Sequence, residues 1–153
     1  LFSFSLFSAA LAHAALAQAD LPQVYEKGGI TVSHVWARAT PLGSKVGVAY
    51  LQIAVKKGSP DTLLSVASPV AAKVQIHTHI QEDGILKMRH LEKLSMAGGE
   101  KIVFEPSGLH LMLLDLKEQL KAGEKLSLTL QFEKAGVLNV EATIEPIGSD
   151  GKK

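Results

Sequence analysis

Apolar and polar residues alternate along several short stretches of the chain, and this period of two is the pattern of a half-buried β-strand. The clearest stretch covers residues 126–132, where leucine and phenylalanine alternate with serine, threonine and glutamine. The same alternation predicts strands over residues 32–37, 49–55, 74–80, 109–113 and 138–144.

Turn-forming residues separate these stretches at regular intervals. Glycine, proline, aspartate and serine gather at residues 41–43, 58–61, 83–84, 98–99, 106–108 and 122–123. Short strands with turns spaced in this way are typical of a β-sandwich or a barrel with Greek-key connections. A helical period is limited to one turn, between Leu116 and Leu120, so the fold class is predicted to be all-β.

The first 17 residues differ from the rest of the chain. They are apolar and small, no charged residue precedes Asp20, and they end in Ala15-Leu16-Ala17. This is the pattern of the apolar region and cleavage site of a secretory signal peptide, and because the chain begins at Leu1 we interpret it as a truncated one. We expect residues 18–29 to be a lead-in, residues 30–146 to be the domain, and residues 147–153 to be a disordered tail.

Composition and charge exclude several classes of function. The formal net charge of +1 gives no basic excess for binding nucleic acid or an anionic membrane surface. We expect no nucleic-acid partner and no stable membrane insertion after signal cleavage. The chain has no cysteine, which removes zinc fingers, iron–sulfur clusters, thiol catalysis and the blue-copper ligand set. The sequence also contains none of the common catalytic motifs, and we predict that the protein is not an enzyme.

Four residues form a compact pattern of metal-ligand type: His77, Met88, His110 and Met112. Residues i and i+2 of a strand share a face, so His110 and Met112 lie opposite the apolar positions at 109, 111 and 113. His77 likewise lies opposite the apolar side of its predicted strand.

The segment between His77 and Met88 can fold as a hairpin around Asp83-Gly84. If these two residues form the whole turn, His79 lies across from Met88. If the pairing of the two strands is shifted by two residues, His77 lies across from Met88 instead. Both registers keep His77, His79 and Met88 on one face, which also carries His90. A neighbouring strand could then add His110 and Met112.

The ligand types select the metal. Thioether sulfur is soft and favours Cu(I), whereas zinc sites use cysteine, histidine and carboxylates and calcium and magnesium prefer oxygen. Two imidazoles and two thioethers are uncharged, and a set without a thiolate suits the carriage of copper in an oxidising compartment.

The spacing His77-x10-Met88-x21-His110-x-Met112 resembles the copper-binding motif of the periplasmic PCu(A)C-type copper chaperones. The segments at residues 35–41, 108–113 and 128–132 are similar too, so the resemblance covers about residues 30–144. It implies a cupredoxin-like antiparallel β-sandwich that binds one Cu(I) per chain through His77, Met88, His110 and Met112. It also implies a periplasmic location and delivery to a copper-accepting protein, chiefly the dinuclear copper centre in subunit II of cytochrome c oxidase, with another copper chaperone as a second partner.

One position departs from the family pattern. Members often carry Met two residues after the first histidine, and this chain has His79, which could be an extra ligand, favour Cu(II) or be neutral surface. Two alternative functions stay open on the sequence: a copper-dependent redox accessory protein, which His79 favours, and a metal-free immunoglobulin-like binding module, which the fold permits.

Overall fold

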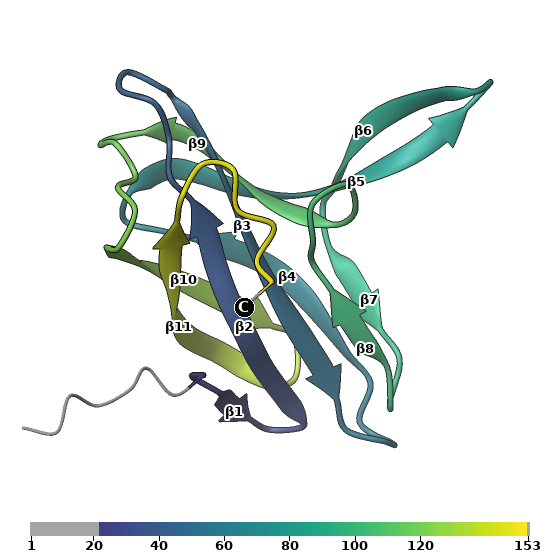
Figure 1. The fold of residues 1–153 in the computed structure, drawn as a ribbon. Helices are drawn as coiled ribbons and strands as arrows, with labels where there is room; N and C mark the ends of the chain where they lie inside the picture. The colour runs from purple at the N-terminus through teal and green to yellow at the C-terminus, as the bar shows by residue number, and fades with distance from the viewer. Residues whose placement is uncertain (1–21, 153) are drawn as a thin grey trace, which may run out of the picture.

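A computed structural model describes residues 22–152, and within this range the chain forms eleven strands and no helix (Figure 1). The predicted all-β class is confirmed. The strands are β1 (Tyr25–Lys27), β2 (Ile30–Arg38), β3 (Val46–Val55), β4 (Asp61–Ala67), β5 (Ala71–Glu82), β6 (Ile85–Leu91), β7 (Leu94–Met96), β8 (Lys101–Val103), β9 (His110–Leu116), β10 (Lys125–Phe132) and β11 (Gly136–Glu145).

Seven of these strands close into a ring of hydrogen-bonded neighbours. Their order is β2–β11–β10–β4–β5–β9–β3 and back to β2. Every neighbouring pair in the ring is antiparallel except β2 and β11, which run parallel. One parallel pair is a consequence of closure, since an odd number of strands cannot alternate in direction all the way round a ring.

The ring encloses one apolar core. The alternating positions predicted from the sequence supply most of it, because each strand turns one face inward. Its most completely buried large side chains are Phe104, Phe132, Ile30, Leu51, Ile53, Leu63, Leu111, Leu113, Leu120, Leu128, Leu130 and Val32.

A β-bulge in β2 changes the face on which Trp36 lies. The register with β3 shifts between Ser33 and Trp36, and His34 in the bulge has a φ of 51°. The alternation of the sequence puts Val32 and Trp36 on one face, but the extra residue moves Trp36 to the outer face. There it pairs with Tyr50, with ring centroids 4.4 Å apart.

The C-terminal segment covers this outer aromatic pair. Residues 147–152 belong to the expected disordered tail, yet the structure places them back over β2 (Figure 1). Arg38 Nε donates a 2.9 Å hydrogen bond to the Ser149 carbonyl, and a Cβ at Gly151 would overlap the Trp36 indole. The tail therefore buries a tryptophan that the bulge would otherwise leave on the surface.

We expect Gly151→Val to lift this tail from Trp36. Gly151 has a φ of +74° and no room for a side chain, whereas a Cβ added at Gly148 would meet nothing within 4 Å. Because Trp36 is the only tryptophan, its fluorescence emission should shift to longer wavelength, with a stability loss of about 1 kcal/mol. Gly148→Val is the matched control, and identical spectra for the two variants would contradict the packing of the tail.

The described residues include part of the predicted lead-in and none of the predicted signal peptide. The predicted signal peptide, residues 1–17, lies outside the described residues. The described part of the lead-in, residues 22–29, contains β1, which pairs with β2.

The hairpin of β5 and β6 projects from the body of the fold (Figure 1). The inner half of β5 belongs to the ring, where it pairs with β4 and β9, whereas β6 pairs with β5 alone among the described strands. The base of this arm is where three strands lie side by side in the order β6–β5–β9.

Candidate metal centre

Three adjacent strands carry the four predicted ligands. His77 on β5 lies directly across from His110 on β9, and Gln75 lies across from Met112. On the other side of β5, His79 lies across from Met88. Each methionine is therefore one diagonal step from His77 on the same face of the sheet, a separation of about 7–8 Å between backbone positions that long side chains can span.

The hairpin turn fixes this register. Asp83 and Gly84 both have positive φ, 50° and 74°, as a two-residue type I′ turn requires. The pairing of Glu82 with Ile85 then places His79 opposite Met88 and His77 opposite His90. Of the two registers that the sequence allowed, the structure has the one with Asp83-Gly84 as the complete turn.

The imidazole rings of His90, His77 and His110 lie next to one another on β6, β5 and β9, and that of His79 lies beside His110. Ring centroids are 5.7 Å apart for His77 and His110, 5.5 Å for His77 and His90, and 5.3 Å for His79 and His110. His110 is only 4% exposed, which is unusual for a histidine, whereas His90 is exposed. The structure thus brings the two predicted imidazole ligands next to each other.

Hydrogen bonds orient both of these rings. His110 Nδ1 lies 2.9 Å from the Gly108 carbonyl, and His77 Nε2 lies 2.8 Å from Gln75 Oε1. His77 Nδ1 is buried, and among the described residues it is the one such side-chain nitrogen or oxygen without a hydrogen-bond partner. A buried polar atom without a partner is costly, and a bound water or ion is one way in which such an atom is satisfied.

Burial and the neighbouring histidines favour the neutral form of His77. Burial lowers the pKa of His77, and the neighbouring His110 and His90 lower it further. A neutral imidazole is the form that binds metal ions, so the site does not need to lose a proton from His77 at neutral pH.

The two methionines differ in exposure. Met112 is half-buried on β9, but Met88 is 53% exposed on the projecting arm. Within residues 22–152, no three side chains of histidine, aspartate or glutamate gather as a metal site by themselves. A metal centre on this face consequently depends on thioether sulfur in addition to imidazole.

His79, the possible extra ligand, lies opposite Met88, and His90 lies opposite His77. His79 Nδ1 lies 3.4 Å from the same Gly108 carbonyl that His110 approaches more closely. The sequence pointed to both residues because they share the face of His77, but sequence reasoning missed Gln75. Only its position could have indicated it, since it lies two residues before His77 and therefore on the same face.

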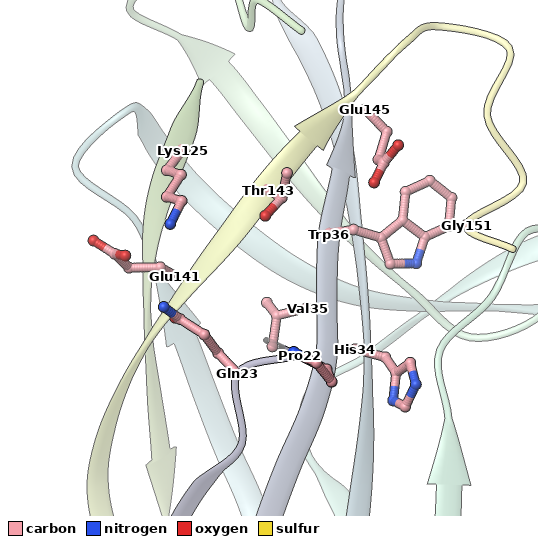
Figure 2. Close-up of a pocket in the computed structure, with 10 residues that line it drawn as sticks. All are labelled: Pro22, Gln23, His34, Val35, Trp36, Lys125, Glu141, Thr143, Glu145 and Gly151. Carbon is pink, nitrogen blue, oxygen red and sulfur yellow. The ribbon is translucent and has the colours of Figure 1, made fainter. Parts of the chain in front are cut away.

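A separate pocket of about 400 Å³ lies elsewhere on the molecule (Figure 2). It is formed by β2, β10, β11 and the chain ends, with Trp36, Thr143 and Glu145 among its lining residues, and it includes none of the four predicted ligands. The candidate metal centre is therefore assigned from the chemistry of its side chains and not from the presence of a cavity.

Comparison with solved structures finds the same fold in copper-binding domains. The copper-bound PCuAC domain of PmoF2 matches with a TM-score of 0.70 and 26% identity, covering 81% of this chain and 98% of that domain. The apo PCuAC domain of PmoF1 matches with a TM-score of 0.68 and 31% identity over 81% and 99%. The Cu(I) form of DR1885 from Deinococcus radiodurans matches with a TM-score of 0.62 and 28% identity over 92% and 89%.

Comparison of sequences gives a matching family and two curated relatives. The family described as putative lipoprotein LpqE-like matches residues 30–144. Putative lipoprotein Lxx21020 of Leifsonia xyli is 29% identical over 68% of this chain, and an uncharacterized protein of Rickettsia prowazekii, RP573, is 28% identical over 64%. The matches span 62% and 56% of these relatives' own lengths.

No helix among residues 22–152 reaches the length and hydrophobicity needed to cross a bilayer.

Proposed function

Since the chain belongs to the PCu(A)C family, the family described as LpqE-like, we propose that it is a copper chaperone that binds one Cu(I) and passes it to an acceptor protein. The proposed ligands are His77, Met88, His110 and Met112. No catalytic step is part of this function.

The observation that carries the proposal is the register across β6, β5 and β9. It places two imidazoles side by side with centroids 5.7 Å apart and one methionine diagonal to His77 on each flank. With metal–nitrogen bonds of about 2 Å, two imidazoles on one ion hold their centroids about 5–6 Å apart. The separation of the two rings is therefore the one expected of two imidazoles that bind the same ion.

The donor set favours the cuprous ion. Two neutral imidazoles and two thioethers leave Cu(I) with a site charge of +1, and soft sulfur donors select Cu(I) over zinc or hard cations. The buried lone pair of His77 Nδ1 supports the proposal, because an ion bound there would supply its missing partner.

We further propose that the protein works outside the cytoplasm, in the periplasm, and that its acceptor is the dinuclear copper centre in subunit II of cytochrome c oxidase. The lipoprotein names of the family and of one relative agree with an extracytoplasmic location. The exposure of Met88 supports transfer, since one sulfur of the site faces the solvent from which an acceptor or a donating chaperone arrives.

A Cu(I) titration followed by X-ray absorption tests the binding. We expect one equivalent of Cu(I) per chain with two nitrogen and two sulfur neighbours, and a rise in Tm because the ion binds only the native state. A chain that takes up no Cu(I), or that shows only nitrogen and oxygen neighbours, would contradict the proposed site.

Delivery needs its own measurement. The copper-loaded chain is mixed with the copper-free soluble domain of oxidase subunit II, and the copper content of the two separated proteins is determined. Copper that stays on the chaperone under conditions in which the acceptor takes up free Cu(I) would reject this acceptor.

A further inference from the structure

The two proposed imidazole ligands use different ring nitrogens for their hydrogen bonds. His110 uses Nδ1 for its 2.9 Å hydrogen bond to the Gly108 carbonyl, which leaves Nε2 as its free nitrogen. His77 uses Nε2 for its 2.8 Å hydrogen bond to Gln75 Oε1, which leaves Nδ1. The nitrogen that has no hydrogen bond is therefore Nδ1 in His77 and Nε2 in His110.

The partner on His77 determines where its proton lies. A carboxamide oxygen only accepts hydrogen bonds, so the Nε2 that faces Gln75 Oε1 must carry the hydrogen. The buried Nδ1 of the neutral ring is then a bare lone pair. A lone pair is what a metal ion requires, whereas an N–H at the same place would repel it.

Gln75 is built into the site and is not a mobile surface side chain. It lies two residues before His77 on β5, on the same face, and it is half-buried. Its direct cross-strand partner is Met112, so Gln75 is next to both Met112 and His77 on the same face of the sheet.

We propose that Gln75 is a positioning residue that holds His77 in the Nε2–H tautomer, so that copper binds His77 through Nδ1 and His110 through Nε2. This inference rests on the proposed function. Outer hydrogen-bond partners of metal-bound histidines set the tautomer and the ring orientation in this way, and their loss typically weakens metal binding 10- to 100-fold. As a neutral acceptor, Gln75 does this without adding charge to the site.

The tautomer can be measured in the metal-free protein. We expect the nitrogen chemical shifts of His77, taken by NMR at mildly alkaline pH where a free imidazole is neutral, to report protonated Nε2 and bare Nδ1. Gln75→Leu should shift His77 toward a mixture of tautomers, and Gln75→Glu, which keeps an acceptor oxygen, should restore the Nε2–H form. Protonated Nδ1 in the wild type, or an unchanged tautomer in Gln75→Leu, would overturn the proposal.

Copper affinity gives the second measurement, by competition with a chromophoric Cu(I) chelator. We expect Gln75→Leu to bind Cu(I) about 10- to 100-fold more weakly than the wild type and Gln75→Glu to recover most of that loss. Gln81→Leu is the matched control, since Gln81 is exposed on the same strand and face near the tip of the arm. Equal affinity of Gln75→Leu and Gln81→Leu would overturn the role of Gln75.

The two measurements separate this inference from the proposed function. The tautomer is determined without copper, so it tests Gln75 even if the wild type were to bind none. A wild type without Cu(I) affinity would instead reject the proposed function.

Discussion

Replacing Met88 with leucine is expected to weaken Cu(I) binding about 100-fold or more. Loss of a residue that only hydrogen-bonds to a metal ligand already weakens binding about 10- to 100-fold, and Met88 is proposed to be a ligand itself. Leucine keeps the apolar volume and removes the sulfur, so the thioether is the only chemistry lost. Met88 is 53% exposed on the arm, and the free energy of unfolding of the metal-free protein should therefore hardly change. Affinity is measured by competition with a Cu(I) chelator.

Leu86→Ala provides the comparison for Met88→Leu. Leu86 is 63% exposed two residues away on the same face of β6, and it carries no donor atom. We expect it to leave Cu(I) affinity unchanged. Wild-type affinity in Met88→Leu would remove Met88 from the ligand set and leave a site of His77, His110 and Met112.

The second large effect is expected on stability, from Asp61→Asn. Asp61 begins β4 and is 7% exposed; its carboxylate accepts hydrogen bonds from the backbone N–H groups of Thr62, Lys134 and Ala135 at 2.7–2.9 Å. Asparagine replaces one acceptor oxygen with a donor that faces these N–H groups. A loss of about 1–3 kcal/mol in the free energy of unfolding is expected from denaturant titration.

The pH dependence identifies the ionised carboxylate as the cause. Burial raises the pKa of Asp61, but the three N–H donors outweigh it and hold that pKa below its ordinary value of 3.8. Because the pKa of Asp61 is lower in the folded than in the unfolded state, its ionised carboxylate stabilises the fold fully at pH values above the unfolded-state pKa. This stabilisation is lost as the pH falls through the folded-state pKa. The difference between wild type and Asp61→Asn should therefore be constant near neutral pH and shrink below about pH 4.

Asp83→Asn is the control for Asp61→Asn. Asp83 is exposed at the tip of the hairpin, and asparagine suits its positive φ of 50°. We expect its free energy of unfolding to equal that of the wild type. A pH-independent difference for Asp61→Asn down to about pH 2 would contradict the role of the charged carboxylate.

Alternation in the sequence predicted the strands that keep one phase. The predicted ranges 126–132 and 138–144 lie within β10 and β11, which pair over eight positions without interruption. β4 was missed because a bulge breaks its phase: Phe132 pairs with Leu63 while Gln131 pairs with Ser65, so buried Leu63 and Val66 lie three residues apart. A bulge depends on the neighbouring strand, which a local pattern does not contain.

The ligand assignment itself stays a prediction, and what can be compared is the placement of its residues. Residue types and spacing were enough to select His77, Met88, His110 and Met112 and to limit the hairpin to two registers that share a face. Direct pairing of His77 with His110 depends on the pairing of β5 with β9 in the ring, which no local pattern contains. The burial of His110 and the acceptor at Gln75 also required the packed structure.

If copper binds as proposed, the arm determines the side from which the ion is reached. His77, His110 and Met112 stand on strands that have hydrogen-bonded neighbours on both sides, whereas Met88 stands on β6, which is bonded along one edge only among the described strands. Ligand exchange at a cuprous ion held there would start at Met88, the sulfur nearest solvent and the one on the least constrained strand. An incoming donor atom would displace it first and the nearly buried imidazole of His110 last.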